Sequence, residues 1–354
     1  WTFRKAEKFF DVVTYTGNAT SGRTIAHSLG STPGMMIVKQ TSGAYNWQIY
    51  HSGFGATKFL EFNNSATQTS TAVWNDTAPT DSVFTVGNEY GVNRSGYTYV
   101  AYLFASDAGG FGDDEDENII KCGSYTGNGS TTGPVIDCGF EPQWVMIKKA
   151  TGVAFWIVVD VMRGMTVSGY SEVLKPNDAA AEALNNWVIP QASGFRINDS
   201  SVNINGSGET YIYMAIRRPM KTPTVGTEVF AADTYSGNGS TTTTLGSGVA
   251  SAGSALTIIK AVNNTTQYVW VDVLRGGGRY LQSNGTNVEI DNSAYWTYDF
   301  KMNGWTITAS GSEVNSGSWN YVAYTLKRAT GFMDVIAYRG DESGTFQAVP
   351  HNLT

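Results

Sequence analysis

Three histidines, two cysteines and a run of acidic residues are the first candidates for chemistry in this chain. His27 and His351 each begin a His-Xaa-Leu tripeptide at nearly the same distance from a recurring tyrosine, so we interpret both as loop-packing residues. His51 has no such counterpart and is a candidate ligand-binding residue. No Ser/His/Asp or Cys/His set and no HExxH spacing can be assembled. We therefore predict that the protein is not an enzyme.

The cysteines and the acidic run carry weaker signals. Cys122 and Cys138 bracket a Gly-Asn-Gly turn and would suit a hairpin disulfide, but we favour two small buried apolar side chains, because the other repeats lack them. Residues 113–117 offer carboxylate oxygens to calcium, but we favour a solvated linker that is kept open by charge repulsion. We predict no cofactor and no metal. The weak metal candidates are Asp113, Asp114 and Asp116.

Aromatic residues are the remaining candidates, because their rings stack on sugars. Most tryptophans fall at repeating strand positions, so we interpret them as core residues. Tyr97 and Trp319 lie just outside the last strand of their repeats and are better candidates for a surface site. The predicted ligand-binding residues are therefore Tyr97, Trp319 and His51.

A tyrosine motif recurs along the chain at the spacing of a domain. Tyr-Thr-Gly-Asn begins at Tyr15 and Tyr125, and Tyr-Ser-Gly-Asn begins at Tyr235, with 110 residues between successive copies; a weaker copy begins at Tyr338. A recurrence at a fixed, domain-sized period indicates tandem modules. We interpret the motif as a hairpin turn near the start of each module, with the tyrosine as its anchor.

Short runs of β-branched and aromatic residues, bounded by Gly, Asn, Ser or Pro, predict an all-β fold. The 40 glycines and the low charged content of 15% agree with many turns and few helices. We expect tandem antiparallel β-sandwich modules, jelly-roll or lectin-like, of about 105–110 residues each. One short surface helix is predicted at residues 177–184, after Pro176.

The module boundaries follow from the repeats and from two short linkers. Residues 1–15 match residues 324–338 without a gap, so the chain is expected to begin on the last strand of a preceding module. The predicted order is the last strand of that module at 1–8, three repeats at 9–112, 118–222 and 228–330, and the start of a fourth at 331–354.

Composition argues against two classes of partner. The formal net charge of −7 gives no support to a nucleic-acid surface, which needs a basic stripe. No apolar run reaches the roughly 18 residues of a membrane helix. We therefore expect no nucleic acid partner and no membrane insertion.

The order of motifs carries a family resemblance. Tyr-Thr-Gly-Asn-Gly-Ser, an apolar run ending in Lys, Asp-Val-Met-Arg-Gly and Tyr-Val-Ala-Tyr-Leu-Phe-Ala together resemble the repeat of tail-fibre and related virion structural proteins of marine bacteriophages, including cyanophages. The resemblance covers nearly the whole chain. It implies a non-enzymatic virion component, commonly trimeric, whose partners are its own copies, other virion proteins and a host-surface glycan or protein.

Three functions remain open at this point. The first is a phage fibre segment in the virion that acts in host adsorption, with glycan recognition by exposed loops. The second is a bacterial extracellular or cell-surface adhesin built of lectin-like repeats. The third is a glycan-cleaving tailspike, which would need two carboxylates flanking a cleft.

Overall fold

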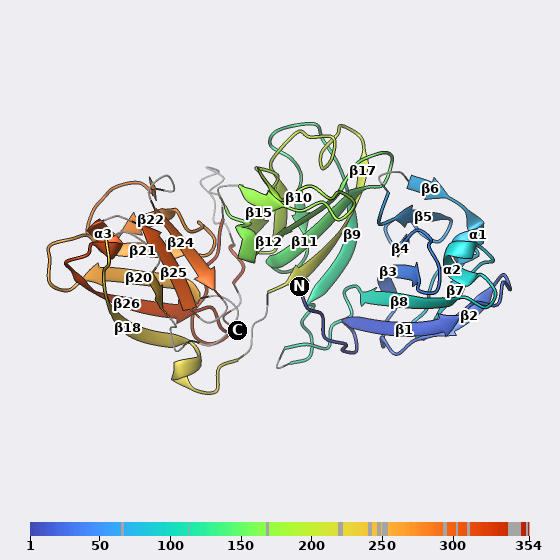
Figure 1. The fold of residues 1–354 in the computed structure, drawn as a ribbon, viewed down its shortest axis with the longest axis horizontal. Coiled ribbons are helices and arrows are strands. Elements are labelled where there is room, and N and C mark those ends of the chain that lie inside the picture. The colour runs from blue at the N-terminus through green and yellow to red at the C-terminus, as the bar shows by residue number, and fades with distance from the viewer. Residues whose placement is uncertain are drawn as a thin grey trace. The chain divides into compact units, whose positions relative to one another are not determined.

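The computed structural model describes residues 1–64, 67–112, 114–167, 170–218, 222–239, 243–245, 249, 254–292, 296–301, 304–309, 312–338, 348–351 and 353. Its sheets are antiparallel and its helices are few and short, so the predicted all-β class is confirmed (Figure 1). The chain forms two compact units. The first comprises Trp1–Val159, Glu172–Trp187 and Gly194–Arg218, and the second comprises Asp160–Ser171, Val188–Ser193 and Pro219–Thr354.

The first repeat contains one large and one small sheet. The large sheet has the order β1-β8-β3-β4-β5-β6, and the small sheet pairs β2 with β7. Its elements are β1 (Phe10–Thr16), β2 (Arg23–Ala26), β3 (Pro33–Gln40), β4 (Gln48–His51), β5 (Lys58–Glu61), β6 (Thr67–Thr69), α1 (Thr71–Trp74), β7 (Val83–Val86), α2 (Tyr90–Asn93) and β8 (Thr98–Ala105).

The second repeat has the same plan. Its large sheet has the order β12-β11-β17-β9, and β10 pairs with β16 in a separate sheet. Its elements are β9 (Ile120–Thr126), β10 (Val135–Asp137), β11 (Pro142–Lys149), β12 (Trp156–Asp160), the 3-10 helix η1 (Val161–Arg163), β13 (Ser171–Val173), β14 (Ala183–Asn185), β15 (Val188–Gln191), β16 (Gly194–Ile197) and β17 (Thr210–Arg217).

The third repeat, like the first, has a large sheet of six strands, in the order β18-β26-β20-β21-β22-β23. Its small sheet has the order β19-β25-β24. Its elements are the 3-10 helix η2 (Gly226–Glu228), β18 (Phe230–Ser236), β19 (Thr243–Leu245), β20 (Ser254–Ala261), β21 (Val269–Asp272), β22 (Arg279–Gln282), β23 (Ile290–Asp291), β24 (Trp296–Lys301), β25 (Gly304–Ala309), α3 (Ser312–Asn315) and β26 (Asn320–Lys327). In every repeat the first strand therefore pairs with the last, and the last pairs with the third.

The tyrosine motif joins the first and last strands of each repeat. Tyr15 lies opposite Tyr99 in the antiparallel register, and the two rings stack with centroids 5.1 Å apart. The same stacked pair is formed by Tyr125 with Tyr211 and by Tyr235 with Tyr321. The period of the sequence motif thus reports a repeated cross-strand contact.

A buried asparagine fixes the segment that follows the motif tyrosine. Asn93 accepts the N–H of Asn18 at 2.9 Å and donates to the carbonyl oxygens of Thr20 and Gly87, both at 2.8 Å. The N–H groups of Asn128 and Asn238 are held in the same way by Asn205 and Asn315. Because a buried amide needs its partners, this network specifies one path for the chain.

The predicted hairpin turn at this motif is wrong. β1 pairs with β8 and β2 pairs with β7, so Gly17 and Asn18 carry the chain from the large sheet to the small one. An Asn-Gly pair between two strands predicts a two-residue hairpin, but here the asparagine network holds a longer crossing segment.

The predicted helix at residues 177–184 is also wrong. A turn occupies residues 176–177, and β14 begins at Ala183. Asn177 accepts the N–H of Trp156 at 2.9 Å, and Asp178 accepts the N–H of Ala180 at 3.1 Å. The side chains of these two residues therefore accept hydrogen bonds from the backbone of β12 and of their own segment and do not cap a helix. The segment is also exposed and has no apolar face that would hold a short helix in place.

Among residues 1–8, Ala6 alone forms a β-bridge, with Phe10. The match between residues 1–15 and 324–338 is nevertheless structural. The recurring contacts are the backbone bridges Ala6–Phe10 and Ala329–Met333 and the ion pairs Lys5–Asp11 at 2.6 Å and Arg328–Asp334 at 2.7 Å. Of the predicted fourth module, the described residues are 331–338, 348–351 and 353.

Each large sheet has an inner face and an outer face. The inner face packs on the small sheet of its own repeat, as where Tyr15 meets Phe84 at 6.1 Å and Tyr235 meets Trp305 at 5.6 Å between ring centroids. Three tryptophans of the core are almost fully buried, namely Trp74, Trp156 and Trp305. The interpretation of these tryptophans as core residues is confirmed.

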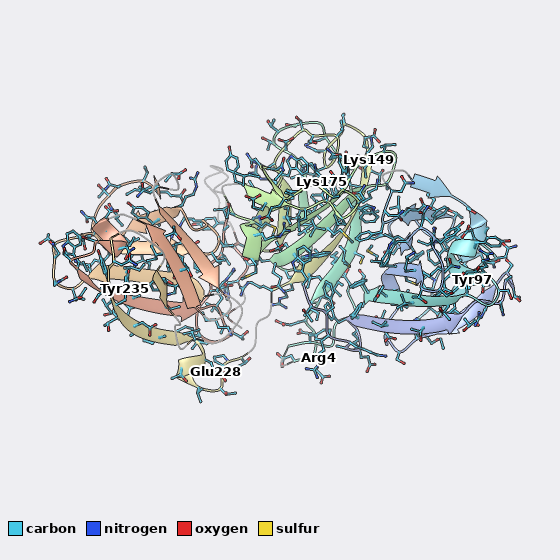
Figure 2. All side chains as sticks on the ribbon, viewed as in Figure 1. Arg4, Tyr97, Lys149, Lys175, Glu228 and Tyr235 are labelled. Carbon is cyan, nitrogen blue, oxygen red and sulfur yellow. The ribbon has the colours of Figure 1, made fainter. Side chains whose placement is uncertain are left out.

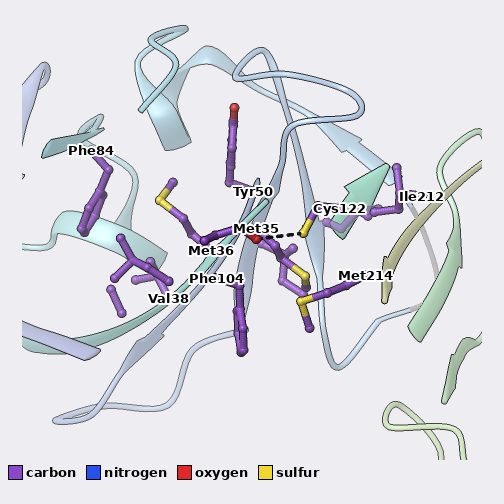
Figure 3. Close-up of a cluster of buried hydrophobic side chains, with 14 of the residues drawn as sticks. Met35, Met36, Val38, Tyr50, Phe84, Phe104, Cys122, Ile212 and Met214 are labelled. Atoms are coloured by element: carbon purple, nitrogen blue, oxygen red, sulfur yellow. Dashed lines mark hydrogen bonds between the residues drawn. The ribbon is translucent and has the colours of Figure 1, made fainter. Parts of the chain in front are cut away.

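The outer faces of the first two repeats share one hydrophobic core within the first unit (Figure 3). Met35 and Phe104 of the first repeat belong to the same buried cluster as Cys122, Ile212 and Met214 of the second. A side chain at Gly34 would come within 2.9 Å of the Cys122 sulfur atom, so glycine permits this close approach. The two repeats are therefore joined by a packed interior.

Candidate functional site

Exposed aromatic rings gather at one end of the first repeat, in the loops β3–β4 and β7–β8. Arg94 lies over the ring of Tyr90 at 4.9 Å and over the ring of Tyr97 at 4.2 Å, measured from its guanidinium carbon to the ring centroids. Tyr90 is 54% exposed, and Tyr97, marked in Figure 2, is half-buried. Tyr45, also exposed, donates its hydroxyl hydrogen to Glu89. We call Tyr45, Tyr90, Arg94 and Tyr97 the first-repeat patch.

Two local features position this patch. Glu89 accepts the N–H of Gly91 at the start of α2, which fixes the acceptor that Tyr45 uses. A side chain at Gly91 would meet the Tyr45 ring at 2.8 Å, so the glycine makes room for the ring. Lys39 donates to the Tyr45 carbonyl oxygen at 2.5 Å and ties the β3–β4 loop to the sheet.

The electrostatics of the patch keep Tyr45 neutral. Burial raises the pKa of the Tyr45 hydroxyl, and the hydrogen bond to the Glu89 carboxylate raises this pKa further. Tyr45 therefore stays a hydrogen-bond donor across the physiological range. The patch offers ring faces together with guanidinium hydrogens from Arg94, which suits a ligand that has both C–H faces and oxygen acceptors.

The predicted candidates Tyr97 and Trp319 occupy equivalent positions. Their carbonyl oxygens accept the N–H of Gly17 at 2.7 Å and of Gly237 at 2.9 Å, and Glu209 does the same for Gly127 at 2.8 Å in the second repeat. Trp319 is half-buried against the core of its own repeat. Of these two residues, Tyr97 is the one that the described contacts place beside exposed rings and an arginine.

The second repeat replaces the aromatic residue of this position with an ion pair. Glu209 contacts Lys149 at 2.9 Å and accepts a hydrogen bond from Thr151. The Thr151 hydrogen bond, followed by the Lys149 ammonium, lowers the pKa of the Glu209 carboxyl. Equivalent loop ends thus carry different chemistry in different repeats.

The prediction of His51 as a surface candidate is contradicted, because this residue is 1% exposed. Its Nδ1 accepts the N–H of Gly53 at 3.0 Å, and its Nε2 lies 3.0 Å from the carbonyl oxygen of Tyr213 in the second repeat. Sequence gave no sign of this contact, since the two residues are 162 positions apart. His51 joins repeats and does not face solvent.

The other histidines occupy the loop position that was expected. In each His-Xaa-Leu tripeptide the leucine N–H donates to the histidine Nδ1 at 3.3 Å, as Leu29 does to His27 and Leu353 does to His351. The cysteines are both buried free thiols, so the favoured interpretation is confirmed and the disulfide is absent. Burial raises the pKa of Cys138 to about 12, and such a thiol is a poor nucleophile.

The acidic run does not assemble a site in the part of the chain that the structure describes. Asp114 and Asp116 are exposed, and Asp113 lies outside the described residues. Glu117 forms an ion pair with Arg217 at 2.9 Å. Among the described residues no group of three or more His, Cys, Asp or Glu side chains is placed to hold a metal ion.

Sequence reasoning found Tyr97 but missed the other members of the first-repeat patch. Tyr45 and Tyr90 come from different loops, and neither matches a repeating position. The sequence held one signal for them, which is that neither tyrosine recurs at the equivalent position of the other repeats. A residue that does not recur is not needed for the fold that the repeats share.

These features define a tandem-repeat, all-β protein with variable loop ends. A family model described as a domain of unknown function, DUF7483, matches residues 5–219 and 225–346, and the chain belongs to this family. The first match spans two repeats and the second spans the third. Neither a curated protein nor a solved structure matches the chain significantly. No helix among the described residues is long and apolar enough to cross a membrane.

Proposed function

We propose that the chain is a segment of a phage virion fibre that acts in adsorption to the host surface, and that the first-repeat patch binds a host glycan. The observation that carries the glycan part is Arg94 lying over two tyrosine rings at a loop end. The fibre part rests on the tandem array and on the resemblance of its motifs to virion fibre repeats. Copies of the chain and other virion proteins are its further partners.

The modules, on this proposal, are lectin-like β-sandwiches of jelly-roll type. The inner-face contacts between large and small sheets support a two-layer arrangement, since rings from both sheets meet between them. Loops at the end of such a scaffold vary without disturbing the core. The difference between Tyr97, Glu209 and Trp319 at one position fits this division of roles.

Binding without cleavage fits the groups in the patch. A pyranose ring presents C–H groups to an aromatic face, and its hydroxyl oxygens accept hydrogen bonds from Arg94. The Glu89 carboxylate beside the patch is already engaged, because it accepts hydrogen bonds from the Tyr45 hydroxyl and from the N–H of Gly91. A retaining or inverting glycosidase would use a pair of carboxylates.

Host-surface polysaccharide titrated into the purified chain tests the glycan proposal. Tyr97→Ala and Arg94→Ala should each weaken binding about tenfold, which corresponds to a loss of about 1.4 kcal/mol. Trp319→Ala, at the equivalent position of the third repeat, is the matched control and should leave the affinity unchanged.

Equal affinity in all variants would show that the patch does not form the binding site. Reducing-end release from the same polysaccharide separates binding from cleavage, and an increase over time would refute the non-enzymatic proposal. Gold-labelled antibodies against the chain test the fibre proposal on intact particles. Labelling that is absent from the particle, or confined to the host cell, would reject a virion location.

A further inference from the structure

The outer face of the third repeat is open where the first two repeats bury theirs. Phe230 stacks on Tyr324 with centroids 6.4 Å apart and an interplanar angle of 11°, just as Phe10 stacks on Tyr102 at 6.4 Å and 7°. Phe10 is 6% exposed, whereas Phe230 is 43% exposed. The same aromatic pair is thus covered in one repeat and uncovered in another.

Neighbouring positions on this face follow the same pattern. Met35 and Trp144 are buried in the first two repeats, but Leu256 at the equivalent position is only half-buried. On the last strand, Phe104 and Ile216 are buried while Leu326 is half-buried. The difference therefore extends across the first, third and last strands of the sheet.

The first unit shows what covers such a face. Its two repeats bury their outer faces in one cluster that contains Met35 and Phe104 from one side and Ile212 and Met214 from the other. The occupant of an outer face is here the outer face of a related module.

We propose that the outer face of the third repeat binds the same face of a second copy of this chain. The described outward residues of β18 and β26 are uncharged and include Phe230, Ala232, Val322 and Tyr324. Contact through these two strands therefore places no unpaired ion in the interface. Contact between identical faces closes at two copies, so it is distinct from the trimer that the fibre resemblance implies. The inference does not depend on glycan binding.

The mass of the full chain in solution, measured by light scattering over a dilution series, tests this contact. The wild-type chain should have the mass of two chains, and the double variant Phe230→Asp/Tyr324→Lys should have the mass of one. Both side chains are already substantially exposed, so the double variant should fold. Val288→Asp, at a residue 85% exposed and outside this face, is the control and should remain paired.

A single-chain mass for the wild type at every concentration would overturn the proposal. So would a mass of two or three chains that the double variant does not change. Circular dichroism of the double variant gives an independent check on folding. If the spectrum shows that the double variant is unfolded, the single variant Phe230→Ser is measured in its place. Phe230→Ser should weaken the association of two chains, and an unchanged association would count against the proposal.

Discussion

Replacing Trp156 with alanine should lower the free energy of unfolding of the first unit by about 3–5 kcal/mol, the usual cost of truncating a fully buried tryptophan. Trp156 is 1% exposed and belongs to the second repeat, yet its side chain contacts Phe62 and Glu61 of the first. Its ring meets Phe62 edge to face at 5.1 Å, and its Nε1 donates to the Glu61 carbonyl oxygen at 3.1 Å. The variant would leave a cavity between the repeats and would remove one of the two hydrogen bonds that the Glu61 carbonyl oxygen accepts, the other coming from the N–H of Asn64 at 3.2 Å.

Urea denaturation followed by tryptophan fluorescence and circular dichroism measures this loss. Because the first two repeats share one core, the wild-type first unit should unfold in a single transition, whereas the variant should separate the repeats into two. Trp47→Ala is the matched control, since Trp47 holds the same position in the first repeat but is only half-buried beside Lys39. A loss in Trp156→Ala no greater than in this control would show that the shared core does not couple the repeats.

The contacts within one repeat were the part of the fold that sequence could predict. Strand types, the tandem period and the roles of buried tryptophans follow from residues that recur, such as Tyr15 opposite Tyr99. A repeated position keeps the same neighbours inside its module, so its chemistry can be read from the copies. The Asn-Gly pair at residues 128–129 misled the local prediction because Asn205, 77 residues away, sets the path of that segment.

Contacts between repeats could not be predicted in this way. His51 and Cys122 are specific to one copy, and a residue without a counterpart fits a surface site as well as a contact between modules. Which face of a sheet meets a neighbouring module depends on packing across two sheets, and strand periodicity alone does not encode it. The first-repeat patch could not be predicted for a similar reason, because Tyr45 and Tyr90 are brought together by loops whose positions the sequence pattern does not determine.

Acid should selectively destabilise the first unit through His51. Its Nδ1 accepts the N–H of Gly53, so the neutral ring carries its hydrogen on Nε2 and donates it to Tyr213. A second proton would have to sit on Nδ1, facing the Gly53 N–H in a buried site. Burial accordingly lowers the pKa of His51 from 6.5 to about 4.

The sign of the effect follows from the two pKa values. Between pH 6.5 and pH 4 the unfolded chain binds a proton at this histidine and the folded chain does not, so stability falls as pH falls through this window. Above pH 6.5 the group contributes no pH dependence. The full loss at the acid end is about 3 kcal/mol, at 1.36 kcal/mol for each pH unit between the two pKa values.

Urea midpoints for the first unit measured from pH 7 to pH 4 would reveal this loss as a slope. His51→Gln keeps an amide donor for Tyr213 but cannot titrate, so its slope should be flatter than that of the wild type whatever its stability at pH 7. His351→Gln, at an exposed histidine of the second unit, should keep the wild-type slope. Carboxylates such as Asp11, whose pKa is lowered by hydrogen bonds to Lys5, Ser28 and Val12 despite burial, add an acid loss common to all three proteins. The difference between slopes therefore isolates His51, and identical slopes in wild type and His51→Gln would show that its burial between the repeats carries no proton-linked energy.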